Sequence, residues 1–371
     1  MIAKEEKRKS NKLVWVIILF LIIGLMFLGK PFKGRIQDLF KQTEKSLELV
    51  QAINIPWNKE GHTRSYERAI INYDGKSISS YDIAGDKLWS KSIDFDEPLV
   101  YLGESRIFIG DKSKGQIVAL NIDGEEGWTY KARQSIDKFA EKNDLLIIYT
   151  KAGEQIDQIN VLDKKGKLLA NTIIDKGRLL SSNISPNHDK FVLVTMDFSG
   201  SKIQSSILLY TIEGKLLWKK DYTDLIILDA DFMNDDAILG ISDRKIISLN
   251  MESELLWSRD IKGRLKDLKL APKQKEIYIL YGEKRDCLEV LEVNGKTKSK
   301  LELDYYYNNI YTDKSNIYLT GENRLTGIRG NEAFLEYICD NKIENLGFQK
   351  DSFLLFTKEG LIIGKLSNRK Q

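Results

Sequence analysis

Few residues of the types that carry out catalysis stand close together in this 371-residue sequence. Only two histidines occur, His62 and His188, and both lie in polar stretches that precede an apolar run. A Ser-His-Asp or Cys-His arrangement would need one of them. Because both stand where a turn is expected, we predict turn roles for them and no catalytic residue.

Metal and thiol chemistry are also weakly supported. Asp94, Asp96 and Glu97 could supply the oxygen ligands that Ca²⁺ prefers, but the glycine and the bidentate spacing of an EF-hand are absent. A solvated loop is the favoured interpretation, and no metal site is predicted. Cys287 and Cys339 form no CxxC or zinc spacing. Two free core thiols are favoured over a single bridge.

One cluster of aromatic residues stands out. Four tyrosines occur in the segment DYYYNNIY, which begins at Asp304, and they are Tyr305, Tyr306, Tyr307 and Tyr311. Exposed tyrosines could offer ring faces and hydroxyl groups to a glycan or a peptide. The alternative is an innermost strand in which alternate rings belong to the core. These four are the candidate ligand-binding residues, and none is predicted to bind a cofactor.

The N-terminal segment is predicted to be a membrane anchor. Leu13 to Gly29 is free of charged residues, and at about 1.5 Å per residue a helix of this length can just cross a bilayer core. The sequence that follows offers no cleavage site, and no nearby cysteine could be acylated. Residues 1–12 form a basic tail, which favours a cytoplasmic N-terminus and a translocated domain. We expect a single-pass protein of the cell membrane that contacts the lipid bilayer through residues 13–29.

Residues 30–49 are predicted to form a short amphipathic helix between anchor and domain. Apolar residues recur there at spacings of three and four, among them Ile36, Leu39, Phe40 and Leu47. Because fewer than three heptads fit, a stalk is favoured over a coiled coil.

The remaining chain, residues 50–371, is built from a tandem repeat, and we expect it to be an extracytoplasmic domain. An apolar strand pattern runs into a turn and then into a short strand ending in a large residue, and four copies end in tryptophan, at Trp89, Trp128, Trp218 and Trp257. The seven turns centre on Gly85, Gly124, Gly166, Gly214, Ser253, Gly295 and Gly330, separated by 39, 42, 48, 39, 42 and 35 residues. Repeats of about forty residues with four strands are typical of propeller blades.

An eighth hairpin, from Ser352 to Leu366, has no final strand behind it. An open last sheet would expose an unpaired edge. Leu47 to Ile55 is the nearest unassigned strand-like segment, so we predict that it pairs with the last blade as its outermost strand. The predicted fold class is all-β, an eight-bladed β-propeller preceded by the transmembrane and amphipathic helices. The alternative has seven blades, with the last hairpin merged into the blade around Ile70 to Trp89.

The Gly-x-x-x-Trp ending of the repeat resembles the tryptophan-docking motif of quinoprotein-type (PQQ-like) eight-bladed propellers. The resemblance implies that the four indoles pack between adjacent blades. An N-terminal anchor followed by such repeats is also similar to the DUF5711 family of bacterial membrane-associated proteins. The long inserted loops that hold the quinone cofactor and calcium are missing from this sequence, so we predict no cofactor.

Charge and repeat together define the expected function. The 57 Lys and Arg residues are interspersed with 54 Asp and Glu residues, so no nucleic-acid interface is predicted. We predict a non-enzymatic, membrane-tethered binding or assembly module with a protein or cell-wall partner on one propeller face. The first alternative is a sensor of cell-wall glycan or peptide. The second is an enzyme, a quinoprotein or a hydrolase.

Overall fold

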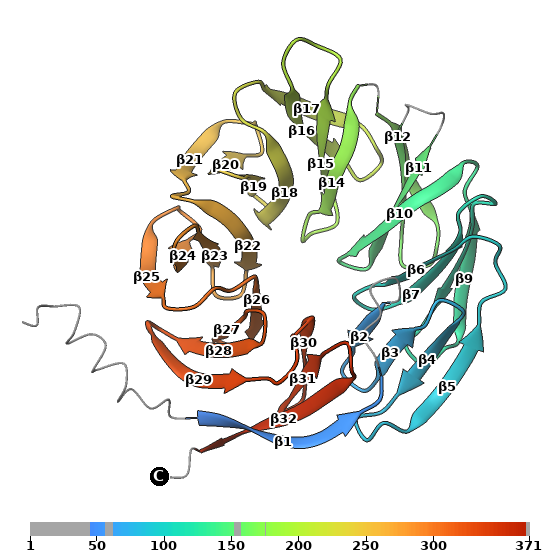
Figure 1. Cartoon of the computed structure of the whole chain (residues 1–371). Helices are drawn as coiled ribbons and strands as arrows, with labels where there is room; N and C mark the ends of the chain where they lie inside the picture. Colours follow the sequence, from blue (N-terminus) through green and yellow to red (C-terminus); the bar gives the residue numbers. More distant parts are fainter. Residues whose placement is uncertain (1–44, 56–61, 152–156, 175, 369–371) are drawn as a thin grey trace, which may run out of the picture. The chain divides into compact units, whose positions relative to one another are not determined.

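The computed structural model describes residues 45–55, 62–151, 157–174 and 176–368. All regular secondary structure in these ranges is β-strand (Figure 1). The predicted tail, the anchor and residues 30–44 of the amphipathic helix lie outside the described residues. Among the described residues, no helix is long and apolar enough to cross a membrane.

The strands follow one another in antiparallel sets of four, and Figure 1 shows the first strand of each set toward the middle of a ring and the last strand at its outside. The first three sets are β2 (Thr63–Ser65), β3 (Ile70–Tyr73), β4 (Ser77–Tyr81), β5 (Lys87–Ser92); β6 (Pro98–Leu102), β7 (Ile107–Asp111), β8 (Gln116–Leu120), β9 (Glu126–Lys131); and β10 (Ser135–Lys142), β11 (Leu145–Lys151), β12 (Asp157–Leu162), β13 (Leu168–Ile173). The next three are β14 (Arg178–Ile184), β15 (Lys190–Asp197), β16 (Gln204–Thr211), β17 (Leu216–Tyr222); β18 (Ile227–Asn234), β19 (Ala237–Ser242), β20 (Lys245–Asn250), β21 (Leu255–Asp260); and β22 (Arg264–Ala271), β23 (Glu276–Gly282), β24 (Asp286–Glu292), β25 (Thr297–Leu303). Each of these six sets is a separate sheet.

The remaining strands share one eight-stranded sheet. They are β26 (Asn309–Asp313), β27 (Asn316–Thr320), β28 (Arg324–Arg329), β29 (Glu332–Ile338), β30 (Asn345–Gln349), β31 (Ser352–Phe356), β32 (Leu361–Asn368) and β1 (Lys45–Ile53), in the order β26-β27-β28-β29-β1-β32-β31-β30. A parallel pairing of Lys45 with Leu335 joins β1 to β29. The C-terminal hairpin β31–β32 therefore pairs with β1, whereas β2–β5 form a sheet of their own.

The predicted pairing of the N-terminal strand with the last hairpin is confirmed. Strand β1 runs antiparallel to β32, and Ile53 pairs with Leu361. The unpaired edge of β32 is thereby covered by a strand from the other end of the described chain. Two segments from opposite ends of the domain sequence thus pair and close the ring.

One prediction about this segment is wrong. Residues 45–49 were expected to end the amphipathic helix, and the domain was expected to begin at residue 50, but all five belong to β1. The spacing of their apolar residues fits a helix, yet pairing with β32 satisfies their backbone and buries Leu47 in the core. A tertiary partner overrides the local preference here.

The hydrophobic core is divided among the interfaces between neighbouring sheets. One cluster joins Ile147 of β11 and Val161 of β12 to Phe191 and Leu193 of β15, in the following sheet. Similar clusters lie between other successive sheets. Four-stranded sheets that pack face to face around a centre define a β-propeller.

Candidate functional site

The four repeat tryptophans lie at junctions between sheets, and each is half-buried. The indole Nε1 atoms donate to backbone carbonyls of the next sheet, Trp89 to Ile122 (3.2 Å), Trp128 to Lys164 (3.1 Å), Trp218 to Met251 (2.7 Å) and Trp257 to Val293 (2.9 Å). Each acceptor lies two residues before the centre of a repeat turn. The indoles therefore pack against the turns, and their only polar group, the Nε1–H, donates to a turn carbonyl.

Close approach explains the glycines of these turns. A Cβ atom on Gly124 would lie 2.8 Å from the Trp89 ring, and φ at this position is +82°. The same holds for Gly166 against Trp128 and for Gly295 against Trp257. Glycine adopts this backbone conformation without strain and leaves space for the indole, although Ser253, with φ +68°, takes the same position beside Trp218.

Where the repeat lacks tryptophan, smaller residues take the contact. Gly214 lies against Ala170, the residue that ends the third copy. At the closure of the ring, Gly85 lies against Ile53 of β1. Ile53, which β1 contributes to the last sheet, thus packs against the first repeat turn.

The four predicted tyrosines do not form one surface. Tyr305 and Tyr306 lie in the loop between β25 and β26, with 46% and 62% of their surface exposed. Tyr307 is buried, its hydroxyl lies 2.7 Å from Thr326 Oγ1, and burial raises the pKa of Tyr307 to about 12. Tyr311 is half-buried in β26 and donates to Asn345 Oδ1 at 3.0 Å. Only the first two can meet a partner through their rings.

Cationic side chains hold both exposed rings. The Arg324 guanidinium lies 3.5 Å from the centroid of the Tyr305 ring, and Lys266 Nζ lies 5.3 Å from that of Tyr306. The Tyr306 hydroxyl also donates to the Lys284 carbonyl at 3.0 Å. Such cation–π contacts contribute about 0.5–1 kcal/mol each at exposed sites. We call Tyr305, Tyr306, Lys266 and Arg324 the tyrosine surface.

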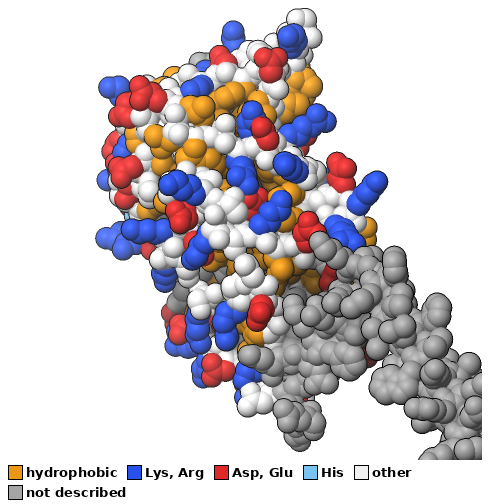
Figure 2. All heavy atoms as spheres, turned by 90° about the vertical axis from the view of Figure 1, so that its left-hand side faces the viewer, with side chains coloured by type: hydrophobic (Ala, Val, Ile, Leu, Met, Phe, Trp, Pro, Cys, Tyr) orange, Lys and Arg blue, Asp and Glu red, His pale blue; other side chains and the backbone are white. Residues whose placement is uncertain are grey.

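The charges behind this surface are balanced. Lys266 Nζ lies 2.7 Å from the carboxylate of Asp286, which is fully buried, and Arg324 lies 3.7 Å from Glu336. On the side of the ring that includes β21 and β25, Figure 2 shows positive and negative side chains mixed with hydrophobic ones. No patch of a single sign gathers on this side.

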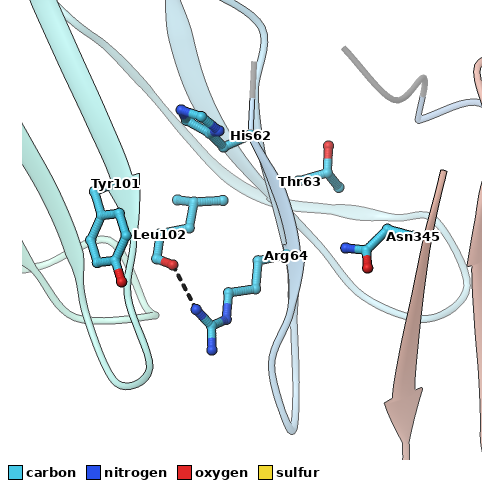
Figure 3. Close-up of a pocket in the computed structure, with 6 residues that line it drawn as sticks. All are labelled: His62, Thr63, Arg64, Tyr101, Leu102 and Asn345. Atoms are coloured by element: carbon cyan, nitrogen blue, oxygen red, sulfur yellow. Dashed lines mark hydrogen bonds between the residues drawn. The ribbon is translucent and has the colours of Figure 1, made fainter. Parts of the chain in front are cut away.

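A hollow of 340 Å³ lies among the inner strands β2, β6 and β30 (Figure 3). Its lining residues are His62, Thr63, Arg64, Tyr101, Leu102 and Asn345. Arg64 Nη1 donates to the Leu102 carbonyl at 2.8 Å and links two neighbouring sheets. Sequence reasoning named only His62 here, and as a turn residue. The hollow was missed because three distant segments contribute to it and no local pattern marks them.

The other residues considered for chemistry have structural surroundings. His188 lies in a turn, with φ +64°. Asp96 pairs with Lys114 at 2.5 Å on the surface. Both cysteines are buried and free, as expected. Across the described ranges, no group of three or more His, Cys, Asp or Glu residues is placed to hold a metal ion.

The fold and these contacts define a β-propeller whose sheets are joined by docked indoles and whose inner strands line a hollow that contains Arg64. The chain belongs to DUF5711, a family of unknown function, which matches residues 41–366. A comparison with curated protein sequences gave no match.

Three solved structures share the fold. Sqt1 from Saccharomyces cerevisiae has a TM-score of 0.61 at 8% identity, over 87% of this chain and 100% of that one. The computationally designed Ika8 protein has a TM-score of 0.59 at 13% identity, over 86% and 99% of the two chains. BamB from Moraxella catarrhalis has a TM-score of 0.54 at 13% identity, with the same coverage of 86% and 99%. At these identities the likeness concerns the fold alone.

Proposed function

We propose that this protein is a membrane-tethered, extracytoplasmic β-propeller of eight blades that acts as a non-enzymatic binding or assembly module for a protein partner. The blade count is supported by six separate four-stranded sheets and by the two sets of four, β26–β29 and β30–β32 with β1, in the remaining sheet. Residues 13–29 supply the proposed tether. The observation that carries the binding proposal is the tyrosine surface.

Two properties of the tyrosine surface favour a protein partner. Tyrosine rings bury a large area at a low cost in side-chain entropy, which is why they are enriched in protein interfaces. Here both rings are already held by Arg324 and Lys266, so less freedom remains to be lost on binding. The cations are balanced by Asp286 and Glu336, so the surface suits apolar and hydrogen-bonding contact better than long-range attraction.

Site-specific photo-crosslinking in cells tests the binding proposal. A photoreactive phenylalanine analogue is placed at position 306 of the full chain, and Phe198, which is 60% exposed in another loop, provides the control position. We expect protein adducts at 306 and several-fold fewer at 198. The additional substitution Tyr305→Ala should reduce the adducts at 306. Equal adducts at both positions, or none at 306, would contradict the proposal.

The tether has its own test. Because Leu13 to Gly29 is an unbroken apolar run without a cleavage site, the mature protein should keep its N-terminus. Mass spectrometry of the protein from membranes measures this, and a product that starts after Gly29 would refute it. Protease added to intact spheroplasts should digest the propeller if it lies outside the cytoplasm, and full protection would place it inside.

The absence of enzymatic chemistry is proposed from the short connections between repeats. Purified full-length protein should show no quinone absorbance and no dye reduction with alcohols or sugars. Stoichiometric quinone, or turnover with either substrate class, would overturn this part of the proposal.

A cell-wall glycan or peptide is the second candidate partner, because the exposed rings of Tyr305 and Tyr306 could also stack on a sugar. Co-sedimentation with purified cell wall distinguishes the two candidates. Binding that is lost in the Tyr305→Ala/Tyr306→Ala double variant, without protein adducts at position 306, would favour the glycan or peptide.

A further inference from the structure

We infer that the hollow among β2, β6 and β30 binds a carboxylate group, with the Arg64 guanidinium as its principal contact. This inference extends the proposed binding function to a second site and names the chemistry of its ligand. It does not depend on the tyrosine surface, which lies in the loop between β25 and β26, so the two can fail separately.

Among the described residues, Arg64 has no carboxylate partner. Its Nη1 atom donates to the Leu102 carbonyl, and its guanidinium lies 5.7 Å from the centroid of the Tyr66 ring. No carboxylate of the described residues lies within 4.0 Å of it. Two other cations of the inner strands form ion pairs, Lys142 with Asp231 and Lys266 with Asp286. A guanidinium has five N–H donors in a planar fork, so Arg64 retains donors for a carboxylate.

The neighbours of Arg64 add further donors. The Tyr101 hydroxyl oxygen accepts from the Glu141 backbone N–H at 3.3 Å, and the Thr63 hydroxyl oxygen accepts from Asn72 Nδ2 at 2.8 Å. Each hydroxyl therefore keeps its own proton to donate. Asn345 Oδ1 accepts from Tyr311 and from the Leu346 backbone N–H. Figure 3 shows the Asn345 amide nitrogen on the side of Arg64. The lining thus includes several groups that can donate hydrogen bonds.

The nearby carboxylate of Glu141 is bound by other donors. Its oxygens accept from Ser105 Oγ at 3.0 Å and from the backbone N–H groups of Glu104 and Ser105, in the loop between β6 and β7. Burial raises the pKa of Glu141, which lowers the share of its charged form. Among the lining residues that the structure describes, Arg64 is the only one with a fixed charge, so a singly charged carboxylate is balanced there and a phosphate dianion is not.

The size of the hollow limits the ligand. Liquid water occupies about 30 Å³ per molecule, so a volume of 340 Å³ admits one acidic amino-acid side chain or a small organic acid but not a folded domain. Two sources of the same chemistry fit. One is an Asp, Glu or C-terminal carboxylate on an extended segment of a protein partner, and the other is a free carboxylic acid.

The two histidines provide a direct readout. His62 lines the hollow, and His188 lies in the turn between β14 and β15 and serves as an internal control. The full chain is labelled with ¹³C-histidine in detergent, and propionate is titrated at fixed pH and ionic strength. We expect a saturable shift of the His62 resonance, because a bound anion stabilises the imidazolium form, and a His188 resonance that follows only the bulk salt.

A matched pair of variants assigns the contact. Arg64→Gln should weaken the saturable shift at least tenfold. Arg244→Gln, which removes the same charge from a side chain that is 85% exposed, should leave it within about twofold of the wild type, since exposed ion pairs such as that of Arg244 with Asp243 contribute little. If Arg64→Gln does not fold, Asn345→Ala replaces it, and a weakening of at least threefold is expected.

Two peptides separate the ligand sources. An N-acetylated, C-amidated tripeptide with a central glutamate is compared with its glutamine counterpart and with free propionate. Binding of the glutamate peptide alone, or at least as tightly as propionate, assigns the site to a protein segment, and binding of propionate alone assigns it to a free acid. The inference is overturned if no carboxylate shifts His62 in a saturable way, if the glutamine peptide does so equally, or if Arg64→Gln and Arg244→Gln behave alike.

Discussion

Neighbouring blades are joined in two different ways, near the outside of the ring and near its centre. At the outside, an indole packs on a turn of the next blade and donates to its backbone, and this contact recurs four times. At the centre the contacts are polar and differ at each junction, for example Arg64 to the Leu102 carbonyl and Asn183 to the Ala230 carbonyl. The repeated contact stabilises the ring, whereas the varied ones leave room for a particular ligand.

Removal of β1, the strand that closes the ring, should cause the largest loss of stability. A chain that begins at residue 54 lacks β1, so it loses the partner of β32 and the contact of Ile53 with Gly85. We expect a loss of at least about 3 kcal/mol in the free energy of unfolding, as for removal of several buried apolar side chains. Urea denaturation followed by tryptophan fluorescence measures it. The control begins at residue 45 and keeps β1, and similar stability of both chains would contradict the role of β1 in closure.

Truncation of one docked indole should have the next largest effect. Trp218→Ala is expected to cost about 3–5 kcal/mol of unfolding free energy, by analogy with large-to-small substitutions in cores. Trp218→Phe keeps an aromatic ring but loses the 2.7 Å bond to the Met251 carbonyl, and should cost about 1 kcal/mol beyond the change in ring volume. A change below about 1 kcal/mol for Trp218→Ala would show that outer docking does not stabilise the ring.

Substitution in the turns separates docking from backbone strain. Gly124→Ala adds a Cβ atom 2.8 Å from the Trp89 ring at φ +82°, whereas Gly330→Ala has φ +62° and no atom within 4 Å of the new Cβ. Both bear the strain of a left-handed residue, about 1–2 kcal/mol, and only Gly124→Ala adds a steric clash. Thermal unfolding should therefore show the larger loss for Gly124→Ala, and equal losses would mean that the indole moves aside freely.

A polar contact at the centre should matter least for stability. Asn183→Ala removes a 2.8 Å bond to the Ala230 carbonyl, and a typical hydrogen bond of this kind contributes about 0.5–1.5 kcal/mol. Asn308→Ala, at an exposed asparagine, serves as the matched control in the same urea experiment. A loss for Asn183→Ala as large as that for Trp218→Ala would overturn the contrast between the two kinds of junction.

The repeat, the strand pairing at the closure and the docking positions could be predicted from the sequence. A turn glycine followed after a fixed interval by a tryptophan is a local signal, because the glycine lies in the turn that leads into the strand that carries the tryptophan. The unpaired last hairpin also predicted a strand near Leu47, since a sheet edge needs a partner. Among the described residues, local periodicity gave the wrong element at residues 45–49, where pairing with β32 overrode a helical spacing of apolar residues.

The environment of single side chains was decided by the tertiary structure. Tyr306 and Tyr307 are adjacent in sequence, yet one is 62% exposed and the other 2%, because the chain turns there from one blade into the next. The hollow around Arg64 is lined by residues of β2, β6 and β30. Strand β2 lies near the beginning of the described chain and β30 near its end. Each repeat of about forty residues encodes one blade of the scaffold, so the scaffold can be predicted from local sequence. A site between blades is formed by residues from different repeats, and these residues come together only when the ring closes.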